Sequence, residues 1–456
     1  MQRSWRGWQG LQRETTMYIK LALRNAKRSI FNYLLYIITM TILIAVMYVS
    51  NGIAIFGNMQ AGFQTASLPL LIVVIMVALV NYINTFMMKQ RAKEFANYLL
   101  LGMEKRKLSQ MFLLEFCIIG MMCFILGALI GATAYFTFFA KELHDAEFQI
   151  TLTIQTLLQT FFFFCIVEIL STIRMYKKIY KLQISELMNE NRRNQSLGGS
   201  KRNLWGISFC IGFISFILLL GGVAFGSENI ADVIISFIAI PLIGCIFTFY
   251  KWIYAYFSFK RLVQSEDLYK GNRLCGIAEM TTGTKTSALM SSIFCICLFF
   301  STLSFVFGTL LLHKELDILN PSSQQWMGFM QISIAVIFIV IYFSILSLQQ
   351  IIELKRQSKN FRILYYMGKS QTQIKSFIKR QVMLKLLIPT LMCFVLLLTI
   401  TPFINYKMNM VFPNTMSNFL INALGGFGVC FVMLYICYFE VVYITSIRYV
   451  KTVIKF

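Results

Sequence analysis

The amino-acid sequence predicts an all-α polytopic membrane protein with ten transmembrane helices. Of its 456 residues, 57% are hydrophobic and 13% are charged, and the mean hydropathy is +0.68. A soluble protein needs more charged and polar surface than this to stay in water. The apolar residues also form runs of about 20 residues, the length that a helix needs to cross a bilayer. Transmembrane β-strands are shorter and alternate apolar with polar residues, which these runs do not.

The expected spans form a 4+2+4 arrangement, with two four-span units around a central hairpin. In chain order the spans are 30–50, 68–88, 111–139, 151–173, 204–225, 233–257, 288–312, 327–348, 386–403 and 419–444. No external link between spans is long enough to bury a core of its own, so no separate soluble domain is expected. The expected division of the chain is 1–16, 17–203, 204–258 and 259–456.

The N-terminal residues differ in composition from the rest of the chain. Residues 1–16 are rich in Trp, Arg and Gln, and Met17 comes directly after them, which indicates a disordered tail or an over-long start. Residues 17–30 place Lys and Arg on one helical face and aliphatic side chains on the other, a pattern typical of an amphipathic helix on the inner leaflet. No cleavable signal peptide is expected, because this basic segment precedes the first span.

Positive charge is concentrated on one side of the expected bundle. The formal net charge is +23, which in a soluble protein would suggest nucleic-acid binding. However, 39 of the 42 Lys and Arg residues lie in the terminal segments and in or beside alternate links. The opposite links contain only Lys141, Lys314 and Lys407. The positive-inside rule therefore places both termini and all basic links in the cytoplasm, and nucleic-acid binding is not needed to explain the charge.

Two of the basic links share a sequence repeat. Residues 89–112 and residues 355–378 align without a gap, and we refer to them as the first and second loop segments. Each segment follows a span and leads into the next one. The aligned identities are Lys89 with Lys355, Lys93 with Lys359, Phe95 with Phe361 and Gly102 with Gly368.

The pattern of each loop segment predicts two short helices joined by a turn. A Lys-rich amphipathic stretch continues the span, and the Gly ends that helix because it readily adopts the left-handed cap conformation. A second basic helix then returns to the membrane. Such a hairpin either merely connects two spans or docks into a groove of a partner, and its occurrence in two copies favours docking.

The pattern Lys/Arg-x-x-x-Lys-Glu-Phe followed by Leu-Gly resembles that of the FtsX-like (MacB-type) ABC transporter permeases. The ten spans narrow the resemblance to the bacitracin- and lantibiotic-resistance-type permeases, and segments 21–29 and 269–285 are similar to that group. The resemblance implies two FtsX-like repeats and a multi-pass permease subunit in the bacterial cytoplasmic membrane. Its function would be export of, or resistance to, antimicrobial peptides or lipid-linked substrates.

In the family, such loops act as coupling helices against a cytoplasmic ABC ATPase dimer. ATP and Mg²⁺ would bind to that partner, because this chain offers no ATP site. Asn360 replaces the acidic Glu94 in the second segment, so that half is expected to couple less strongly. The resemblance carries the role of contacting the ATPase over to Lys89, Lys93, Glu94, Phe95 and Gly102, and to Lys355, Lys359, Phe361 and Gly368.

One departure from the family concerns the external side. The resistance-type permeases carry a large extracellular domain between spans 7 and 8, whereas this chain has only residues 313–326 there. Peptide capture by such a domain is therefore not expected. A short-loop exporter, an immunity permease or a permease with another sensing partner fits equally well.

Two alternative functions stay open. One is a peptide-sensing membrane partner of a histidine kinase, without net transport. The other is an ion-driven secondary transporter, which would need charges near the membrane midplane and broken helices.

Three acidic residues lie within or at the ends of expected spans, and an intramembrane carboxylate is a functional candidate by default. They are Glu115, Glu168 and Glu440. The structural interpretation is hydrogen bonding within the bundle or to the basic loops. The functional interpretation is that Glu168 and Glu440, in corresponding spans 4 and 10, move together during coupling.

No constellation for catalysis or metal binding is found in the sequence. Gly368-Lys369-Ser370 resembles the end of a P-loop, but Ile363 stands where that motif needs a Gly. None of the 11 Cys residues lies in an external link, and the two His residues lie in separate links. We therefore expect a non-catalytic subunit with no cofactor or metal of its own.

Overall fold

The computed structural model describes residues 37–55, 67–139, 146–181, 202–226, 238–262, 277, 284–313, 321–411 and 419–454. Within these ranges every regular element is a helix. Nine of the helices found there are long and apolar enough to cross a membrane. The described part of the chain is therefore all-helical, and its apolar helices indicate a multi-pass membrane protein.

These nine helices coincide with nine of the ten expected spans. The remaining expected span, 68–88, overlaps the helix α2 (Ser67–Gln90). That this helix crosses the membrane stays a prediction. The tail 1–16 and the amphipathic helix 17–30 lie outside the described residues.

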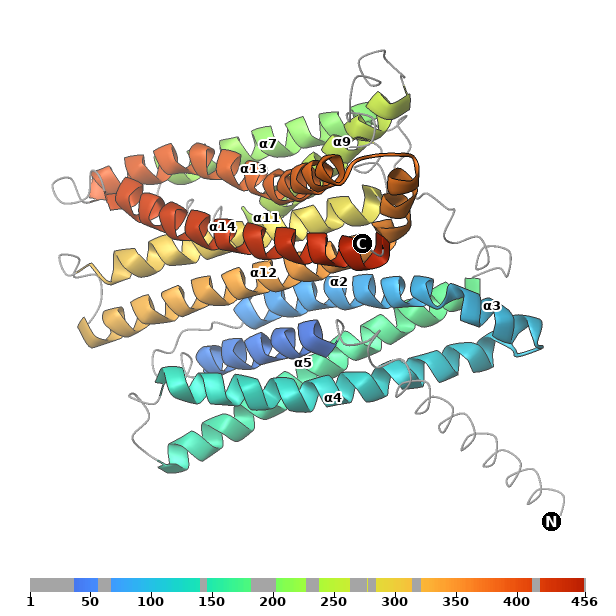
Figure 1. Ribbon diagram of the computed structural model, residues 1–456. Helices are drawn as coiled ribbons and strands as arrows, with labels where there is room; N and C mark the ends of the chain where they lie inside the picture. The colour runs from blue at the N-terminus through green and yellow to red at the C-terminus, as the bar shows by residue number, and fades with distance from the viewer. Residues whose placement is uncertain are drawn as a thin grey trace, which may run out of the picture. The chain divides into compact units, whose positions relative to one another are not determined.

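The chain divides into two compact units, residues 1–193 and residues 194–456, and each is described by itself. In the first unit α4 packs against α5, and α2 packs against α5 as well (Figure 1). The division expected from the sequence, with a separate central hairpin, stays a prediction. The helices of the first unit are Ile37–Ile55, α2 (Ser67–Gln90), α3 (Ala92–Leu100), α4 (Lys105–Phe139) and α5 (Ala146–Lys181).

Two glycines allow α4 to approach the helix Ile37–Ile55 closely. A Cβ atom at Gly127 would lie 2.8 Å from the Cβ atom of Ile44. A Cβ atom at Gly131 would lie 2.7 Å from the Cβ atom of Tyr48 and 2.9 Å from the carbonyl oxygen of Ala45. Small residues four positions apart share one helical face and are typical of closely packed transmembrane helices.

Polar side chains also join the helices of the first unit. Asn51 donates a hydrogen bond to the Thr160 hydroxyl at 2.9 Å, and Asn84 donates one to the Ser171 hydroxyl at 2.6 Å. All four side chains are buried. Because lipid offers no competing donors or acceptors, such pairs hold α5 against its neighbours, each by about 0.6–2 kcal/mol.

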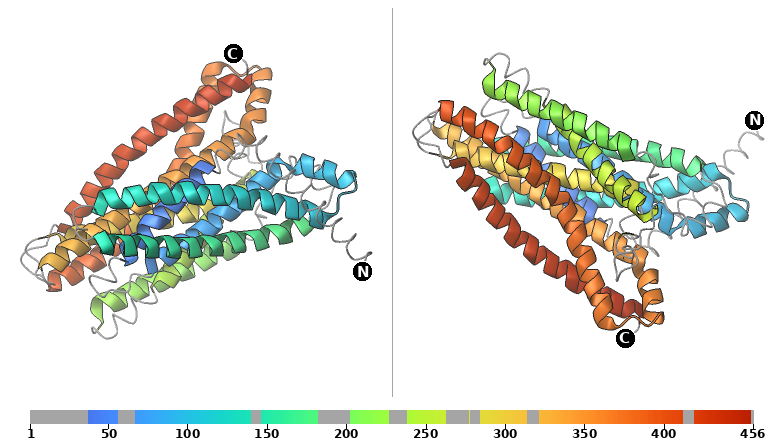
Figure 2. Two further views of the ribbon diagram at one scale, coloured as in Figure 1. Left: turned by 90° about the horizontal axis from the view of Figure 1, so that it is seen from below. Right: turned by 90° about the horizontal axis from the view of Figure 1, so that it is seen from above.

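The second unit is built around α11. This helix packs against α9, α12, α13 and α14, while α7 pairs with α9 (Figures 1 and 2). Phe294, Cys295 and Phe299 of α11 are buried among these neighbours. The helices of the unit are α7 (Arg202–Phe225), α9 (Ala239–Leu262), α11 (Thr284–Leu311), α12 (Pro321–Tyr366), α13 (Gln371–Val411) and α14 (Phe419–Ile454).

A hydrogen bond joins α9 to α13 at a proline. Pro389 lies inside α13, where it cannot donate a backbone hydrogen bond. The hydroxyl of Tyr250, a fully buried residue of α9, donates to the carbonyl oxygen of Pro389 at 2.7 Å. The hydroxyl therefore has a partner in an otherwise apolar core, as a buried polar group requires.

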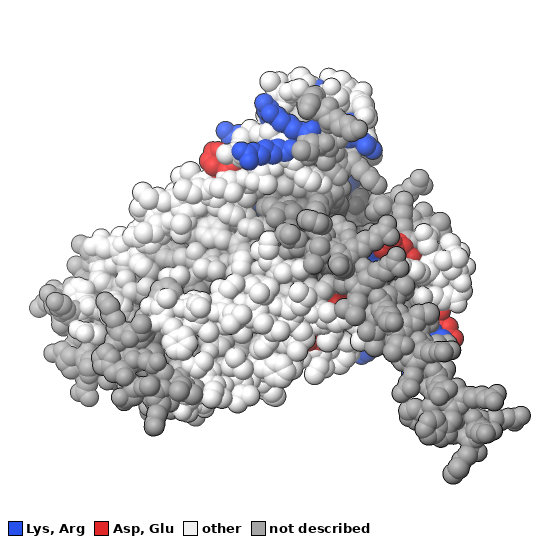
Figure 3. All heavy atoms as spheres, turned by 60° about the horizontal axis from the view of Figure 1, so that its bottom comes forward, with Lys and Arg blue, Asp and Glu red and all other residues white. Residues whose placement is uncertain are grey.

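The lateral surface of the helices is apolar. Figure 3 shows a broad face without charged side chains, and the Lys, Arg, Asp and Glu residues that it draws in colour gather at its top and right-hand side. Leu218 of α7 is 70% exposed and Met433 of α14 is 65% exposed. A surface of this kind is stable only against lipid or another apolar surface.

Candidate functional site

The first loop segment forms a helical hairpin between α2 and α4. Arg91 separates α2 from α3, with backbone angles φ −98° and ψ 9° in the bridge region between the helical and extended basins. The short α3 then runs to Leu100, and α4 begins at Lys105. α3 is therefore a distinct short helix between α2 and α4, as the sequence pattern predicts.

Gly102 ends α3 with a Schellman motif. Its φ is 91°, and its N–H donates to the carbonyl oxygen of Leu99 at 3.1 Å. The N–H of Met103 donates to the carbonyl oxygen of Tyr98 at 3.0 Å. These two bonds satisfy the last carbonyls of the helix, and the positive φ explains why a Gly occupies the position.

The second loop segment turns in the same way at Gly368. Its φ is 84°, and its N–H donates to the carbonyl oxygen of Tyr365 at 3.0 Å. The N–H of Lys369 donates to the carbonyl oxygen of Leu364 at 3.2 Å. The two aligned glycines therefore make the same turn, and the Gly-Lys-Ser sequence belongs to this turn.

The helices around the second turn differ in detail. α13 begins with a capping box, in which the N–H of Gln373 donates to the Ser370 hydroxyl and the N–H of Ser370 donates to the Gln373 side chain, both at 3.3 Å. α12 continues without interruption through the position that aligns with Arg91. The break before the first turn is therefore absent before the second.

Both turns carry large exposed apolar side chains at the tip. In the first segment Leu100 is 62% exposed and Leu101 is 84% exposed. In the second, Tyr366 is 77% exposed and Met367 is 68% exposed. Sequence reasoning missed these residues, although a signal was present, since two large apolar residues precede the capping Gly in both copies. Water-exposed pairs of this kind are typical of contact surfaces.

Two of the residues predicted to couple to a partner are buried inside the loops. Phe95 packs edge-to-face against Phe112 of α4 with ring centroids 4.9 Å apart. Phe361 packs edge-to-face near Phe377 of α13 at 6.3 Å. Phe95 and Phe361 are 1% and 2% exposed. Their side chains hold each hairpin together, and their role in coupling stays a prediction.

The other predicted loop residues lie on the surface of the hairpins or on their helices. The side chain of Glu94 is 57% exposed on α3, and both turn glycines are exposed. The four predicted lysines lie on helices, but their side chains are outside the described part of the chain. They are Lys89 on α2, Lys93 on α3, and Lys355 and Lys359 on α12.

Arg91 connects the first loop segment to the core of α4. Its Nε lies 2.8 Å from a carboxylate oxygen of Glu94, and its Nη1 lies 2.6 Å from a carboxylate oxygen of Glu115. The guanidinium also lies over the rings of Phe95 and Phe112, at 5.7 and 6.0 Å from their centroids. The Glu115 side chain has no exposed surface, so this carboxylate makes an ion pair to a basic loop, as the structural interpretation expects.

Another ion pair flanks the second loop segment. Its acidic residue precedes the capping Gly and its basic residue follows it, the reverse of the order in Arg91 and Glu115. Lys385 of α13 lies 3.1 Å from a carboxylate oxygen of Glu353 of α12, and both side chains are 9% exposed. Arg91, Lys385 and Glu353 were missed as candidates. The sequence contained a signal for both pairs, because the members of each pair stand at nearly equal distances on either side of the capping Gly.

The other two acidic candidates have different surroundings. Glu168 of α5 faces Gly120 of α4, where an added Cβ atom would lie 2.7 Å from the carboxylate oxygen Oε1. That oxygen is buried and has no hydrogen-bond partner in the described part of the chain. Glu440 is exposed on α14. Their joint movement during coupling stays a prediction.

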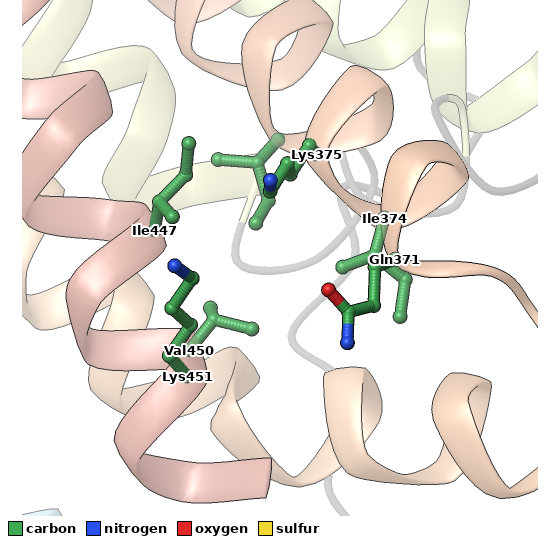
Figure 4. Close-up of a pocket in the computed structure, with 7 residues that line it drawn as sticks. Gln371, Ile374, Lys375, Ile447, Val450 and Lys451 are labelled. Carbon is green, nitrogen blue, oxygen red and sulfur yellow. The ribbon is translucent and has the colours of Figure 1, made fainter. Parts of the chain in front are cut away.

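A small cleft lies beside the second turn, between the start of α13 and the end of α14. Figure 4 shows the amines of Lys375 and Lys451 on its two walls and the amide of Gln371 at its edge. Its apolar lining comes from Ile374, Ile378, Ile447 and Val450. No acidic residue lines it.

The described residues contain no group of three His, Cys, Asp or Glu side chains that could hold a metal ion. The cysteines in those ranges are free thiols.

Comparison with known proteins identifies the segment that contains the first turn. Residues 66–184, which include α2, α3, α4 and most of α5, match the family model described as FtsX-like permease C-terminal. The chain carries an FtsX-like permease domain. Its first loop segment lies inside the matched residues, and its second loop segment lies outside them.

The chain also resembles a curated protein. It is 26% identical over 258 residues to the bacitracin export permease protein BceB of Bacillus subtilis (strain 168). The matched region makes up 51% of this chain and 38% of the length of BceB. The chain is thus similar to part of a permease, over less than half of that protein's length.

Proposed function

We propose that this chain is the permease subunit of a bacterial ABC transporter. It couples ATP hydrolysis by a separate ATPase to export of, or resistance to, antimicrobial peptides or lipid-linked substrates. The observation that carries the proposal is the pair of hairpins that turn at Gly102 and Gly368, one of them inside the FtsX-like domain. The subunit itself is non-catalytic, and ATP and Mg²⁺ bind to the partner.

The exposed tips provide the docking surface for the ATPase dimer. The backbone beside the tips is held by the hydrogen bonds of the turns, so a partner that covers the tips orders side chains but little backbone. The tip residues are Leu100, Leu101, Tyr366 and Met367. Apolar anchors at the centre of an interface contribute most of the binding energy. Two tips in one chain match the two subunits of an ATPase dimer.

The orientation follows from charge. The loop segments belong to the links that contain nearly all Lys and Arg residues, and the positive-inside rule places them in the cytoplasm, where ATP is available. Both termini then lie in the cytoplasm too. The identical turns support two repeats, and with them the 4+2+4 arrangement of ten spans.

The substrate class rests on the likeness to BceB, whose name assigns it to bacitracin export. The short link 313–326 argues against peptide capture by a large external domain of this chain. Because the link 313–326 is short, another chain would have to sense the peptide, and a sensor histidine kinase remains a predicted further partner.

Co-purification tests the proposal. The wild-type chain, extracted from native membranes in a mild detergent, is expected to retain an ATPase. The double variant Leu101→Asp/Met367→Asp places one charge on each apolar tip and is expected to lose it. Gln110→Asp/Ser376→Asp is the matched control, because both residues are exposed at aligned positions of the loop segments but not at the tips.

Two results would count against this function. Extraction of the wild-type chain without any ATPase would remove the transporter assignment. Loss of the ATPase in the control variant as well would show that added negative charge, and not the loss of the apolar tips, causes dissociation.

A further inference from the structure

The first loop segment contains a chain of charges that runs from its surface into its core. Arg91 lies between Glu94, whose side chain is 57% exposed, and Glu115, whose side chain is completely buried. One guanidinium can serve two carboxylates at once because it has five N–H donors in a rigid plane. Arg91 also stands at the break between α2 and α3, so it connects this break to α4.

All three charges are absent from the second segment. The ungapped alignment, continued three residues beyond the two loop segments, places Gln357 opposite Arg91, Asn360 opposite Glu94 and Gln381 opposite Glu115. Each charged residue is thus replaced by a neutral amide, so the three charges are lost together, which is consistent with their acting as one unit.

The second hairpin has its own ion pair, at a different distance along the helices from the capping Gly. Glu353 and Lys385 align with Met87 and Ile119, which are buried apolar residues in the first unit. Each lies four residues, about one helical turn, further from the capping Gly than Arg91 and Glu115 do. Both members of the second pair are 9% exposed, whereas the first pair reaches the surface through Glu94, which is 57% exposed.

We propose that Glu94, Arg91 and Glu115 form an electrostatic relay that makes the two loop segments inequivalent. A basic side chain of the ATPase binds Glu94, and Arg91 transmits the displacement of α3 to α4 through Glu115. The second segment docks through its apolar tip without such a relay. The inference rests on the proposed function, because the partner is the ATPase that co-purifies with the chain.

Charge complementarity supports this choice of partner group. Glu94 is an exposed carboxylate whose orientation is fixed by a hydrogen bond from Arg91. Binding of a basic side chain therefore costs less side-chain entropy at Glu94 than it would at a freely rotating carboxylate. Arg91 binds both carboxylates at once through different nitrogens, so Glu94 can contact a partner while Glu115 keeps its cation. Glu115, by contrast, depends on a cation, because a buried carboxylate without one is strongly unfavourable.

The first experiment measures association with the co-purified ATPase at low salt. Glu94→Gln is expected to weaken binding by about fivefold, the effect of one exposed charge pair, and the difference should disappear at high salt. Glu104→Gln is the matched control, since it removes the same charge from an exposed position in the same turn. Its affinity is expected to equal that of the wild-type chain.

The second experiment installs the amides of the second segment in the first. Arg91→Gln/Glu115→Gln leaves no buried charge unpaired and is expected to fold, because amides already occupy the aligned positions of the second hairpin. It should bind the ATPase through Glu94 and the apolar tip. Stimulation of ATP hydrolysis by the permease is expected to fall by about fivefold or more, because the relay is interrupted.

The outcomes separate the relay from the proposed function. If the wild-type chain binds no ATPase, both are overturned. If the wild-type chain binds the ATPase but the Glu94→Gln and Glu104→Gln variants bind it with equal affinity, the proposed contact at Glu94 is wrong. If Arg91→Gln/Glu115→Gln stimulates ATP hydrolysis as strongly as the wild-type chain does, the proposed transmission from α3 to α4 through Arg91 and Glu115 is wrong. A lower melting temperature with unchanged stimulation would assign the charges a structural role only.

Discussion

Gly102 and Gly368 hold the same left-handed backbone conformation at aligned positions of the two loop segments, with φ of 91° and 84°. In both, the glycine N–H and the N–H of the next residue close the preceding helix. The hairpins thus share a rigid turn that depends on backbone conformation, and side chains decide how each hairpin is held.

The first prediction concerns this conformation. Gly102→Ala and Gly368→Ala are each expected to lower the free energy of unfolding by about 1 kcal/mol, because an alanine is strained at positive φ. An added Cβ atom would meet nothing within 4 Å at either site, so only the backbone conformation is tested. The measurement is thermal unfolding in detergent.

Gly221→Ala is the control for these turns. A Cβ atom there also meets nothing within 4 Å, but Gly221 lies inside α7 with ordinary helical φ. Alanine is expected to be neutral or stabilising by up to about 1 kcal/mol. Equal destabilisation at all three sites would contradict the explanation.

The second prediction concerns the close contact between α4 and the helix Ile37–Ile55. Gly131→Ala is expected to destabilise the protein by about 1–3 kcal/mol, because the added methyl group would lie 2.9 Å from a backbone carbonyl that cannot move alone. Gly426→Ala, where the methyl group meets nothing within 4 Å, is the control. Melting temperatures that do not differ between the two would rule out close packing at Gly131.

The third prediction concerns the bond between α9 and α13. Tyr250→Phe removes the hydroxyl that donates to the carbonyl oxygen of Pro389 and is expected to cost about 1 kcal/mol of stability. Tyr256→Phe removes a hydroxyl from an exposed residue of the same helix and is expected to be close to neutral. Chemical unfolding of both variants checks the difference, and a neutral Tyr250→Phe would contradict it.

The fourth prediction concerns the ion pair between α12 and α13. Lys385→Ile alone leaves the carboxylate of Glu353 buried, with an expected cost of about 3–5 kcal/mol. Glu353→Met/Lys385→Ile installs the apolar residues that the first segment has at the aligned positions, and it is expected to be nearly neutral. A double-mutant cycle on melting temperature checks this, and additive losses would show that the pair does not act as a unit.

Much of the fold could be predicted because bilayer length and helical pattern are local properties. Nine expected spans coincide with membrane-length helices, and both helix ends at the capping glycines follow from the sequence. The candidate site was predicted only in part. Glu94 is exposed as a contact residue needs to be, whereas Phe95 and Phe361 lie inside their hairpins, since a large apolar side chain in an amphipathic loop serves packing as readily as binding.

The sequence by itself determined the membrane helices, the basic links and the two glycine turns, because each depends on hydrophobicity, charge or backbone freedom within a short stretch. Only the tertiary structure decided which charges meet. Arg91 and Glu115 stand 24 positions apart, and Lys385 meets Glu353 with the polarity reversed. An ion pair is defined by a distance of a few ångströms across two helices, and that distance exists only after the hairpin has closed.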